Sequence, residues 1–192
     1  MRRLLLALPC VLLLAACGPG PGKKVSGDGA RLEVTRNFGQ VGVYSTTVPQ
    51  IRDGETVMRF LMSKREVKTR FGGGFVNAID GLEAGTSGGH SDWFYFVNGI
   101  EASVGAAEMT LHAGDVVQWD YRRWDATMRV PAIVGAYPEP FLHGAGGKRL
   151  PVRLECASPT GTACKTVQQR LKDSGVSTSS GEIGRASCRE RV

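Results

Sequence analysis

Short stretches of alternating apolar and polar residues run through much of this 192-residue chain. Residues 31–36 alternate in this way, with Leu32 and Val34 on one face. Residues 41–48 alternate again, and Pro49 follows them directly. Because proline has no backbone N–H, a central strand cannot continue through it. The pattern therefore predicts two strands, the second of which ends at Pro49.

The next stretch has the spacing of a helix. The positions i, i+3 and i+4 are taken by three apolar residues, Val57, Phe60 and Leu61. Either Asp53 or Thr56 could cap the amino terminus, because each side chain offers an oxygen to the free backbone N–H groups of a first turn. We predict a helix over residues 55–63.

Strand patterns return after this helix. Residues 66–70 alternate, the glycine run 72–74 breaks the chain, and residues 75–79 form another strand candidate. Residues 93–97 are apolar on both faces and lead directly into Asn98-Gly99. Asn-Gly between strand formers is a strong signal for a hairpin, since both turn positions require a positive φ. We therefore predict a hairpin at Asn98-Gly99.

Residues 116–121 are the last clear strand of this region, with Val117, Trp119 and Tyr121 on one face. Strands, one helix and then further strands are typical of an α+β domain with a mostly antiparallel sheet. We expect this domain to span residues 30–125.

The chain changes character after this domain. Residues 130–134 predict a short edge-like strand, and residues 137–141 are expected to be extended or turn-like. Residues 152–156 alternate, and residues 165–173 predict a helix that stops near a glycine. We expect residues 126–180 to be an incomplete C-terminal α+β segment.

The amino terminus resembles a bacterial lipoprotein signal. A basic start precedes the apolar stretch Leu4–Leu14, which is too short for a membrane span, and Ala15-Ala16-Cys17 then matches a lipobox. We predict a signal peptide over residues 1–16 and lipidation of Cys17. The plainer alternative is an ordinary signal with an incidental cysteine. A lipidated Cys17 would attach the protein to the extracellular face of the cell membrane, with the Pro/Gly-rich residues 17–29 as a flexible linker.

The carboxyl end changes the charge balance. Residues 181–192 have no apolar period and resemble read-through from an adapter or vector, so we expect a non-native tail; a disordered native tail is the alternative. The whole chain has 24 Lys and Arg against 18 Asp and Glu, a net charge of +6. Without the signal peptide and this tail the charge is +3, and no long basic run remains. The sequence therefore gives no support for nucleic acid as a partner.

The five cysteines fall into two groups. Cys10 lies in the signal peptide, Cys17 is the lipidation site and Cys188 lies in the tail. The remaining pair, Cys156 and Cys164, is eight residues apart across a turn-rich loop in an oxidising compartment. A disulfide is favoured over two free thiols. A zinc site is disfavoured because no further His or Cys stands nearby at ligand spacing.

The middle of the chain resembles the transcobalamin-like C-terminal domain, the DUF4430 family. The resemblance depends on residues 92–99 (DWFYFVNG), on Gly105 and on residues 114–121 (GDVVQWDY), and it covers about residues 31–125. It implies a β-grasp-like fold, in which such a domain covers cobalamin from one side while a separate helical barrel covers the other. The chain has no such barrel, so the resemblance implies a helical-barrel partner protein or another small ligand.

Aromatic residues are concentrated between positions 93 and 124, and flat rings with polar edges suit a flat ligand. The alternative is that these rings simply form the core. Trp119, Tyr121 and Trp124 lie among charged residues, so we expect these three rings near a rim. The charged residues are Asp120, Arg122, Arg123 and Asp125. The candidate ligand-binding residues are Tyr95, Asn98, Trp119, Tyr121 and Trp124.

Nothing in the sequence predicts catalysis, a resident cofactor or a metal site. His90, His112 and His143 stand alone and are expected at the surface, although coordination of a cobalt ligand by one of them stays open. We therefore expect a non-enzymatic lipoprotein that captures a small ligand, with cobalamin or another corrinoid as the ligand that the resemblance implies, and passes it to an uptake transporter. The alternatives are a non-catalytic module that binds a protein or a cell-wall polymer, and a secreted enzyme whose catalytic part lies beyond this sequence.

Overall fold

The computed structural model describes residues 29–86, 89–125 and 127–182. The elements of the main body are, in chain order, β1 (Ala30–Arg36), β2 (Val41–Val48), α1 (Val57–Met62), β3 (Val67–Arg70), the 3-10 helix η1 (Phe71–Gly73), β4 (Phe75–Ile79), β5 (Leu82–Glu83), β6 (Ser91–Val97), β7 (Ile100–Glu101) and β8 (Val116–Arg123). A carboxyl-terminal unit follows, with β9 (Val152–Cys156), α2 (Thr162–Asp173) and β10 (Thr178–Glu182). The described chain is therefore a mixed α+β protein made mostly of strands, as expected.

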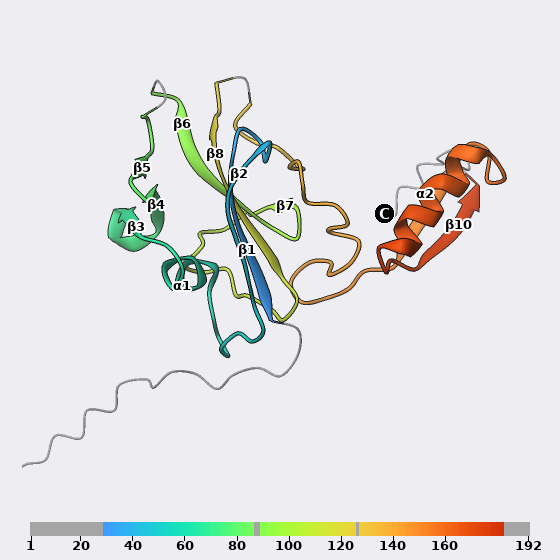
Figure 1. Ribbon diagram of the computed structural model, residues 1–192, viewed down its shortest axis with the longest axis horizontal. Helices are drawn as coiled ribbons and strands as arrows, with labels where there is room; N and C mark the ends of the chain where they lie inside the picture. Colours follow the sequence, from blue (N-terminus) through green and yellow to red (C-terminus); the bar gives the residue numbers. More distant parts are fainter. Residues whose placement is uncertain (1–28, 87–88, 126, 183–192) are drawn as a thin grey trace, which may run out of the picture.

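A five-stranded sheet forms the centre of the main body (Figure 1). Its strand order is β2-β1-β8-β6-β7. The pairs β1–β2, β6–β8 and β6–β7 are antiparallel, whereas β1 and β8 are parallel. The expected mostly antiparallel sheet is confirmed, with one parallel pair at its centre. This pairing brings the first and last strands of the body side by side, although they are about eighty residues apart in sequence.

The predicted hairpin at Asn98-Gly99 is present, and a second hairpin joins β1 to β2. Asn37 and Phe38 take positive φ values at the turn between β1 and β2, and β2 is an edge strand that ends before Pro49. Asn98 and Gly99 have φ values of 50° and 72° and join β6 to β7. Positive φ at both central positions is the geometry that Asn-Gly favours, which explains why this turn could be predicted from two residues.

The helix α1 and a second, three-stranded sheet of order β3-β4-β5 pack on one face of the large sheet. Thr56, and not Asp53, caps α1: its Oγ1 accepts a hydrogen bond from the backbone N–H of Arg59 at 3.3 Å. The three residues that predicted the helix, Val57, Phe60 and Leu61, are all buried. They meet Leu32 and Val34, which point inward as expected.

The opposite face of the large sheet carries many polar side chains and is partly covered. We call residues 127–147 the covering segment. Its residues 130–134 do not form the predicted strand: the backbone N–H of Val134 donates to Phe38 O at 3.1 Å, and Val134 O accepts from Gln118 Nε2 at 3.3 Å. The prediction was wrong because Pro131 has no N–H to donate and because this backbone bonds to side chains and to a turn instead of to a neighbouring strand.

Arg122 on β8 is buried under the covering segment and bonds to its backbone. Only 1% of the residue is exposed, and its guanidinium lies 3.7 Å from the centre of the Phe94 ring. It donates to the backbone oxygens of Thr127 at 3.4 Å and Met128 at 3.1 Å, which fixes the start of the covering segment. Burial lowers the pKa of Arg122, while the nearby Glu101 acts in the opposite direction. A polar strand face here therefore indicates a covered face and not a solvent-exposed one.

The carboxyl-terminal unit lies to one side of the main body (Figure 1). In it β9 and β10 pair in parallel, and α2 connects them. The predicted helix over residues 165–173 is confirmed and begins three residues earlier, at Thr162. The strand β10 was not predicted, and it runs two residues into the segment 181–192 that we expected to be non-native.

Cys156 and Cys164 form the expected disulfide, with their Cα atoms 6.0 Å apart. It joins the end of β9 to the first turn of α2. The unit buries few large side chains of its own, Cys164, Leu171 and Val176 among them. A unit this small lacks the apolar area that larger domains use for stability.

We predict that replacing both cysteines with alanine melts this unit while the main body stays folded. Closing a loop of this length stabilises a fold by about 2–3 kcal/mol, a large share of what so small a unit can have. Amide hydrogen exchange should show loss of protection in α2 and unchanged protection in β1 and β8. The exposed loop residue Thr160, changed to alanine, is the control. Retained protection of α2 in the double variant would contradict the prediction.

The predicted signal peptide, the lipidation site Cys17 and the linker up to residue 28 lie outside the described residues, as do residues 183–192. Within the described ranges, no helix is long and apolar enough to cross a membrane.

Candidate functional site

Three of the predicted ligand-binding residues are part of the core. Tyr95, Trp119 and Tyr121 are 9%, 2% and 3% exposed and lie on the sheet face that packs against α1. The rings of Tyr95 and Trp119 stack with their centres 5.0 Å apart, and Tyr121 contacts Trp93 at 5.2 Å. The expectation that Trp119 and Tyr121 lie near a rim is wrong, because their strand, β8, is at the centre of the sheet. Of the charged neighbours that suggested a rim, Asp120 and Arg122 are buried on the other face, whereas Arg123 and Asp125 are exposed near Trp124. A role in ligand binding for these three residues stays a prediction.

Asn98 is fully buried, and the protein itself satisfies its amide. Its Nδ2 donates to Asp115 Oδ1 at 2.8 Å and to Gly144 O at 3.1 Å, while its Oδ1 accepts from the backbone N–H of Val116 at 2.8 Å. The side chain thus ties the β6–β7 turn to the start of β8 and to the covering segment. Its contact with a ligand also stays a prediction.

Trp124 is the predicted site residue that lies nearest to solvent. It is half-buried just after β8, and its ring stacks on His90 with the centres 4.9 Å apart and the planes within 8°. His90 Nδ1 in turn lies 2.7 Å from Asp125 Oδ1. The structure therefore separates the five predicted residues: four are buried, and Trp124 stands apart from them at the surface.

Tyr95 offers a test of this burial through its ionisation. Burial, with a smaller contribution from Glu108, raises the pKa of Tyr95 to about 12, and its hydroxyl donates to Val104 O at 2.5 Å. Because the folded pKa is above the unfolded value of about 10, the stabilising effect of the neutral hydroxyl is complete below pH 10. It is lost as the pH rises from 10 to 12, by about 3 kcal/mol in total.

We therefore expect the free energy of unfolding to fall between pH 10 and pH 12, and the fall to be smaller in a Tyr95→Phe variant. An absorbance titration of tyrosinate should lose its most alkaline step in that variant. The chain has four tyrosines, so the step is a resolvable fraction of the signal. An unchanged alkaline step in Tyr95→Phe would contradict the assigned burial.

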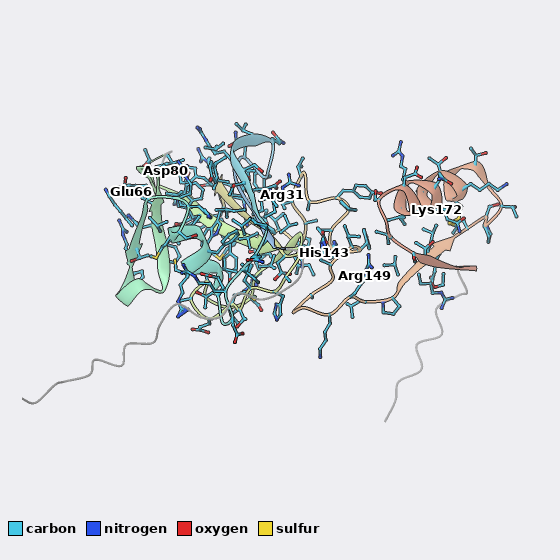
Figure 2. All side chains as sticks on the ribbon, turned by 60° about the horizontal axis from the view of Figure 1, so that its bottom comes forward. Arg31, Glu66, Asp80, His143, Arg149 and Lys172 are labelled. Carbon is cyan, nitrogen blue, oxygen red and sulfur yellow. A yellow bond between two sulfur atoms is a disulfide. The ribbon has the colours of Figure 1, made fainter. Side chains whose placement is uncertain are left out.

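A groove lies on the other face of the sheet, between β1 and the covering segment. It has a volume of about 310 Å³. The sheet contributes Arg31, Glu33 and Thr47 to its lining, and the covering segment contributes a second group of polar and apolar residues, Ala136, Tyr137, Pro138, Glu139, Leu142 and His143. Figure 2 shows Arg31 and His143 on the side of the main body that faces the carboxyl-terminal unit. We call this cavity the β1 groove.

Glu139 fixes the orientation of the His143 ring. One carboxylate oxygen is in close contact with His143 Nδ1, and the other accepts from the backbone N–H of His143 at 3.0 Å. The Glu139 side chain is only 4% exposed, so the carboxylate is held in place. With Nδ1 as the donor to this carboxylate, Nε2 is the ring nitrogen left for another partner.

Gly114 makes room for this ring. It has a φ of +88°, and a Cβ placed on it would lie 2.8 Å from Cδ2 and 3.1 Å from Nε2 of His143. Any other residue would therefore be strained and would also push the imidazole away. A glycine in the Gly-Asp turn before β8 is thus a requirement of the β1 groove.

Arg31 and Glu33 form an ion pair on the opposite wall. Their side chains are in close contact, with Arg31 about half exposed and Glu33 mostly buried. Both also line a second hollow of about 490 Å³ along β1 and β2, in which Thr35, Ser45 and Gln118 lie. The two hollows share these side chains and Gly135, so the polar face of β1 is accessible over much of its length.

The β1 groove thus offers cationic donors, carboxylate acceptors and a free imidazole nitrogen beside apolar surface. Such a mixture binds ligands that carry both polar and apolar parts. Among the residues that the structure describes, no three His, Cys, Asp or Glu side chains gather closely enough to hold a metal ion.

Sequence reasoning missed Glu139 and the groove as a whole. The isolated His143 was expected at the surface and is instead about a third exposed, paired with the glutamate four residues before it. The spacing Glu139-x-x-x-His143 was the one local signal. It pointed to no site because residues 137–141 gave no helical pattern that would place the two side chains on one face.

Comparison with known proteins supports the predicted domain. Residues 54–123, from just before α1 to the last residue of β8, match the family described as "Domain of unknown function (DUF4430)". A crystal structure from Ruminococcus gnavus, of a protein described as a candidate metal-binding protein, is 15% identical in sequence with a TM-score of 0.39; the match covers 50% of this chain and 97% of that one. No curated protein matches the chain.

Proposed function

We propose that this protein is a membrane-anchored extracellular module that captures a small ligand in the β1 groove and passes it to an uptake system. The observation that carries the proposal is the groove itself, in which Glu139 holds His143 opposite the Arg31–Glu33 pair. A fixed imidazole and a fixed ion pair are pre-organised, so a ligand that binds them loses little free energy in ordering side chains.

We favour binding over catalysis because the described residues of the groove include no serine, cysteine or lysine nucleophile. The imidazole of His143 is oriented by Glu139, and the carboxylate of Glu33 is paired with Arg31. Among the residues that line the groove, none of these three nucleophile types stands beside His143 for the imidazole to activate. We therefore assign the paired groups to recognition of the polar edge of a ligand.

The ligand class that we propose first is cobalamin or another corrinoid, which draws on the DUF4430 match and on the resemblance of residues 92–99 and 114–121 to the transcobalamin-like domain. The peripheral amides of a corrin ring both donate and accept hydrogen bonds, and Arg31, Glu33 and His143 Nε2 supply both kinds of partner. A groove of about 310 Å³ holds one edge of so large a molecule, so a helical-barrel partner or a transporter would cover the rest.

A β-grasp-like fold and a lipid anchor belong to the same proposal. A central parallel pair of first and last strands, with a helix on one face of a mixed sheet, is compatible with a β-grasp arrangement. The lipobox-like sequence ending at Cys17 supports attachment to the extracellular face of the membrane, with the residues before β1 as the tether.

We predict that Arg31→Ala and His143→Ala each weaken corrinoid binding by the purified full chain at least about tenfold, which corresponds to about 1.4 kcal/mol. Each change removes a hydrogen-bonding partner from the β1 groove and leaves the core intact. Isothermal titration calorimetry with cobalamin and with cobinamide measures the effect. Arg153→Ala, which removes an exposed arginine of the carboxyl-terminal unit, is the matched control.

Two results would contradict this function. One is the absence of measurable heat with either corrinoid, both alone and with a candidate barrel protein present. The other is binding that Arg31→Ala and His143→Ala leave unchanged, which would place the ligand elsewhere.

The alternative is a non-catalytic surface module that binds a protein or a cell-wall polymer. It draws on a different observation, the exposed apolar side chains of the edge strand β2 and of the covering segment, Val41, Val43, Val134, Tyr137 and Phe141. Exposed edges and apolar patches are surfaces on which partner chains dock.

A further inference from the structure

A further pocket lies between the end of β2, the loop 49–55 and α1, which follow one another in the chain (Figure 1). It has a volume of about 320 Å³, which is within the range of small-molecule sites. None of its lining residues also lines the β1 groove. We call it the α1 pocket, and it is separate from the proposed corrinoid site.

Three charged side chains contribute to the lining of the α1 pocket. They are the carboxylate of Glu55 and the cationic groups of Arg52 and Lys64. In the part of the chain that the structure describes, none of the three makes an ion pair or a side-chain hydrogen bond. Opposite charges that line one hollow without direct contact leave room for a ligand that carries charges of both signs.

Glu55 is the most specific of these groups because it is buried. Only 9% of the residue is exposed. Its carboxylate oxygens have no partner within the described ranges and yet are not sealed inside the protein, unlike the unpartnered Nε1 of Trp119. They are therefore accessible from the α1 pocket, which Glu55 lines. Because a carboxylate that has lost most of its water is stabilised by a cation, this group favours a ligand with an ammonium group.

The backbone holds this carboxylate in place. The N–H of Glu55 donates to Arg52 O at 3.1 Å, and Glu55 O accepts from the N–H of Leu111 at 2.8 Å. The next residue, Thr56, caps α1. Glu55 and Arg52 thus belong to one fixed turn, and Lys64 comes from the far end of α1. A ligand that binds here loses little free energy in ordering the carboxylate.

The balance of charge indicates which ligand fits. The α1 pocket has two cationic groups, Arg52 and Lys64, for the one carboxylate of Glu55. An acidic α-amino acid has the complementary set, one ammonium and two carboxylates. The planar guanidinium of an arginine suits a carboxylate especially well, because it donates two parallel hydrogen bonds to it.

We propose that the α1 pocket binds an acidic α-amino acid, with the ammonium group on Glu55 and the two carboxylates on Arg52 and Lys64. The methylene groups of such a ligand lie against the apolar side chains of Ile51 and Phe60, which also line the pocket. The protein thus has a second ligand, of a different chemical class from the one proposed for the β1 groove.

The test is isothermal titration calorimetry of the full chain at neutral pH with L-glutamate and with two relatives that each lack one charged group. L-Glutamate should bind in a saturable way. Glutarate has both carboxylates but no ammonium, so it leaves Glu55 unpaired and should bind at least about tenfold more weakly. L-Glutamine has one carboxylate and should bind about two- to fivefold more weakly, since pairs with exposed cations contribute less.

Variants of the lining residues locate the site. Glu55→Gln keeps the size of the side chain and removes its charge, so it should remove most of the preference for L-glutamate over glutarate. Without ligand its melting temperature should not fall, because the carboxylate has no partner to lose among the described residues. Arg52→Gln and Lys64→Gln should each weaken L-glutamate about two- to fivefold. The same change at the exposed Lys172 of α2 is the control and should have no effect.

Three results would overturn the proposal. One is the absence of saturable heat from L-glutamate with the unmodified chain. Another is binding of glutarate or L-glutamine to that chain as tightly as L-glutamate. The third is a clearly lower melting temperature of Glu55→Gln, which would give the carboxylate a structural role. The first two are measured on the unmodified chain, so they hold even if a variant fails to fold.

Discussion

Replacing Asn98 with alanine should lower the free energy of unfolding by about 3–5 kcal/mol. The change removes three buried hydrogen bonds and leaves the Asp115 carboxylate, Gly144 O and the N–H of Val116 each short of one partner. A buried group that loses its partner costs about 1–3 kcal/mol. Alanine must also adopt a φ of 50°, which adds about 1–2 kcal/mol of backbone strain.

The variant Asn98→Gly separates these two contributions. Glycine takes the positive φ without strain but makes none of the side-chain hydrogen bonds. Urea unfolding of the two variants should therefore differ by about the strain alone, with Asn98→Gly still strongly destabilised. If Asn98→Ala instead unfolds like the unmodified chain and loses only ligand binding, Asn98 is a contact residue and its assigned structural role is wrong.

Replacing Trp119 with alanine should also cost about 3–5 kcal/mol, the usual range for removing a large aromatic side chain from a core. Trp119 stacks on Tyr95 and lies on the central strand, opposite Val34 of β1. Its removal leaves a cavity between the sheet and α1 that the surrounding backbone cannot close without breaking strand pairing.

Trp124→Ala is the matched control for this variant. The same side chain is removed, but Trp124 is half-buried and its main ring contact is the exposed His90. We expect a loss below about 1 kcal/mol, as is typical of surface positions. Equal melting behaviour of the two variants would contradict the placement of Trp119 in the core.

Much of the main body could be predicted because the residues that determine its turns and its helix are close together in sequence. The Asn98-Gly99 hairpin needs only two residues of suitable φ, and α1 needs only the spacing of Val57, Phe60 and Leu61 together with a capping Thr56. The disulfide was predictable because the other three cysteines could be assigned elsewhere.

The placement of polar residues could not be predicted in the same way. Asp120 and Arg122 suggested a rim, yet Asp120 accepts hydrogen bonds from Thr35 Oγ1 at 2.8 Å and from the N–H of Phe38 at 2.9 Å, and it is fully buried. These partners are more than eighty residues away in sequence, and the covering segment that excludes water comes later still. No local pattern contains that information.

The β1 groove was missed for the same reason. Arg31 and His143 are more than one hundred residues apart in sequence and come together because β1 pairs with β8 and the covering segment folds back over both. Within this groove the Arg31–Glu33 and Glu139–His143 pairs are local, but neither locates the other in the fold. The spacing of four between Glu139 and His143 has a clear meaning only on a helix.

The central claim is that the ligand binds in the β1 groove. The most direct test is a map of backbone amide chemical shifts in the full chain, recorded during titration with cobinamide. The largest shifts should fall on Arg31, Glu33 and the residues around His143, with little change at the exposed β2 residues Val41 and Val43 or at Trp124. Shifts concentrated at Trp124 or at Val41 and Val43, or no saturable shift at all, would contradict the claim.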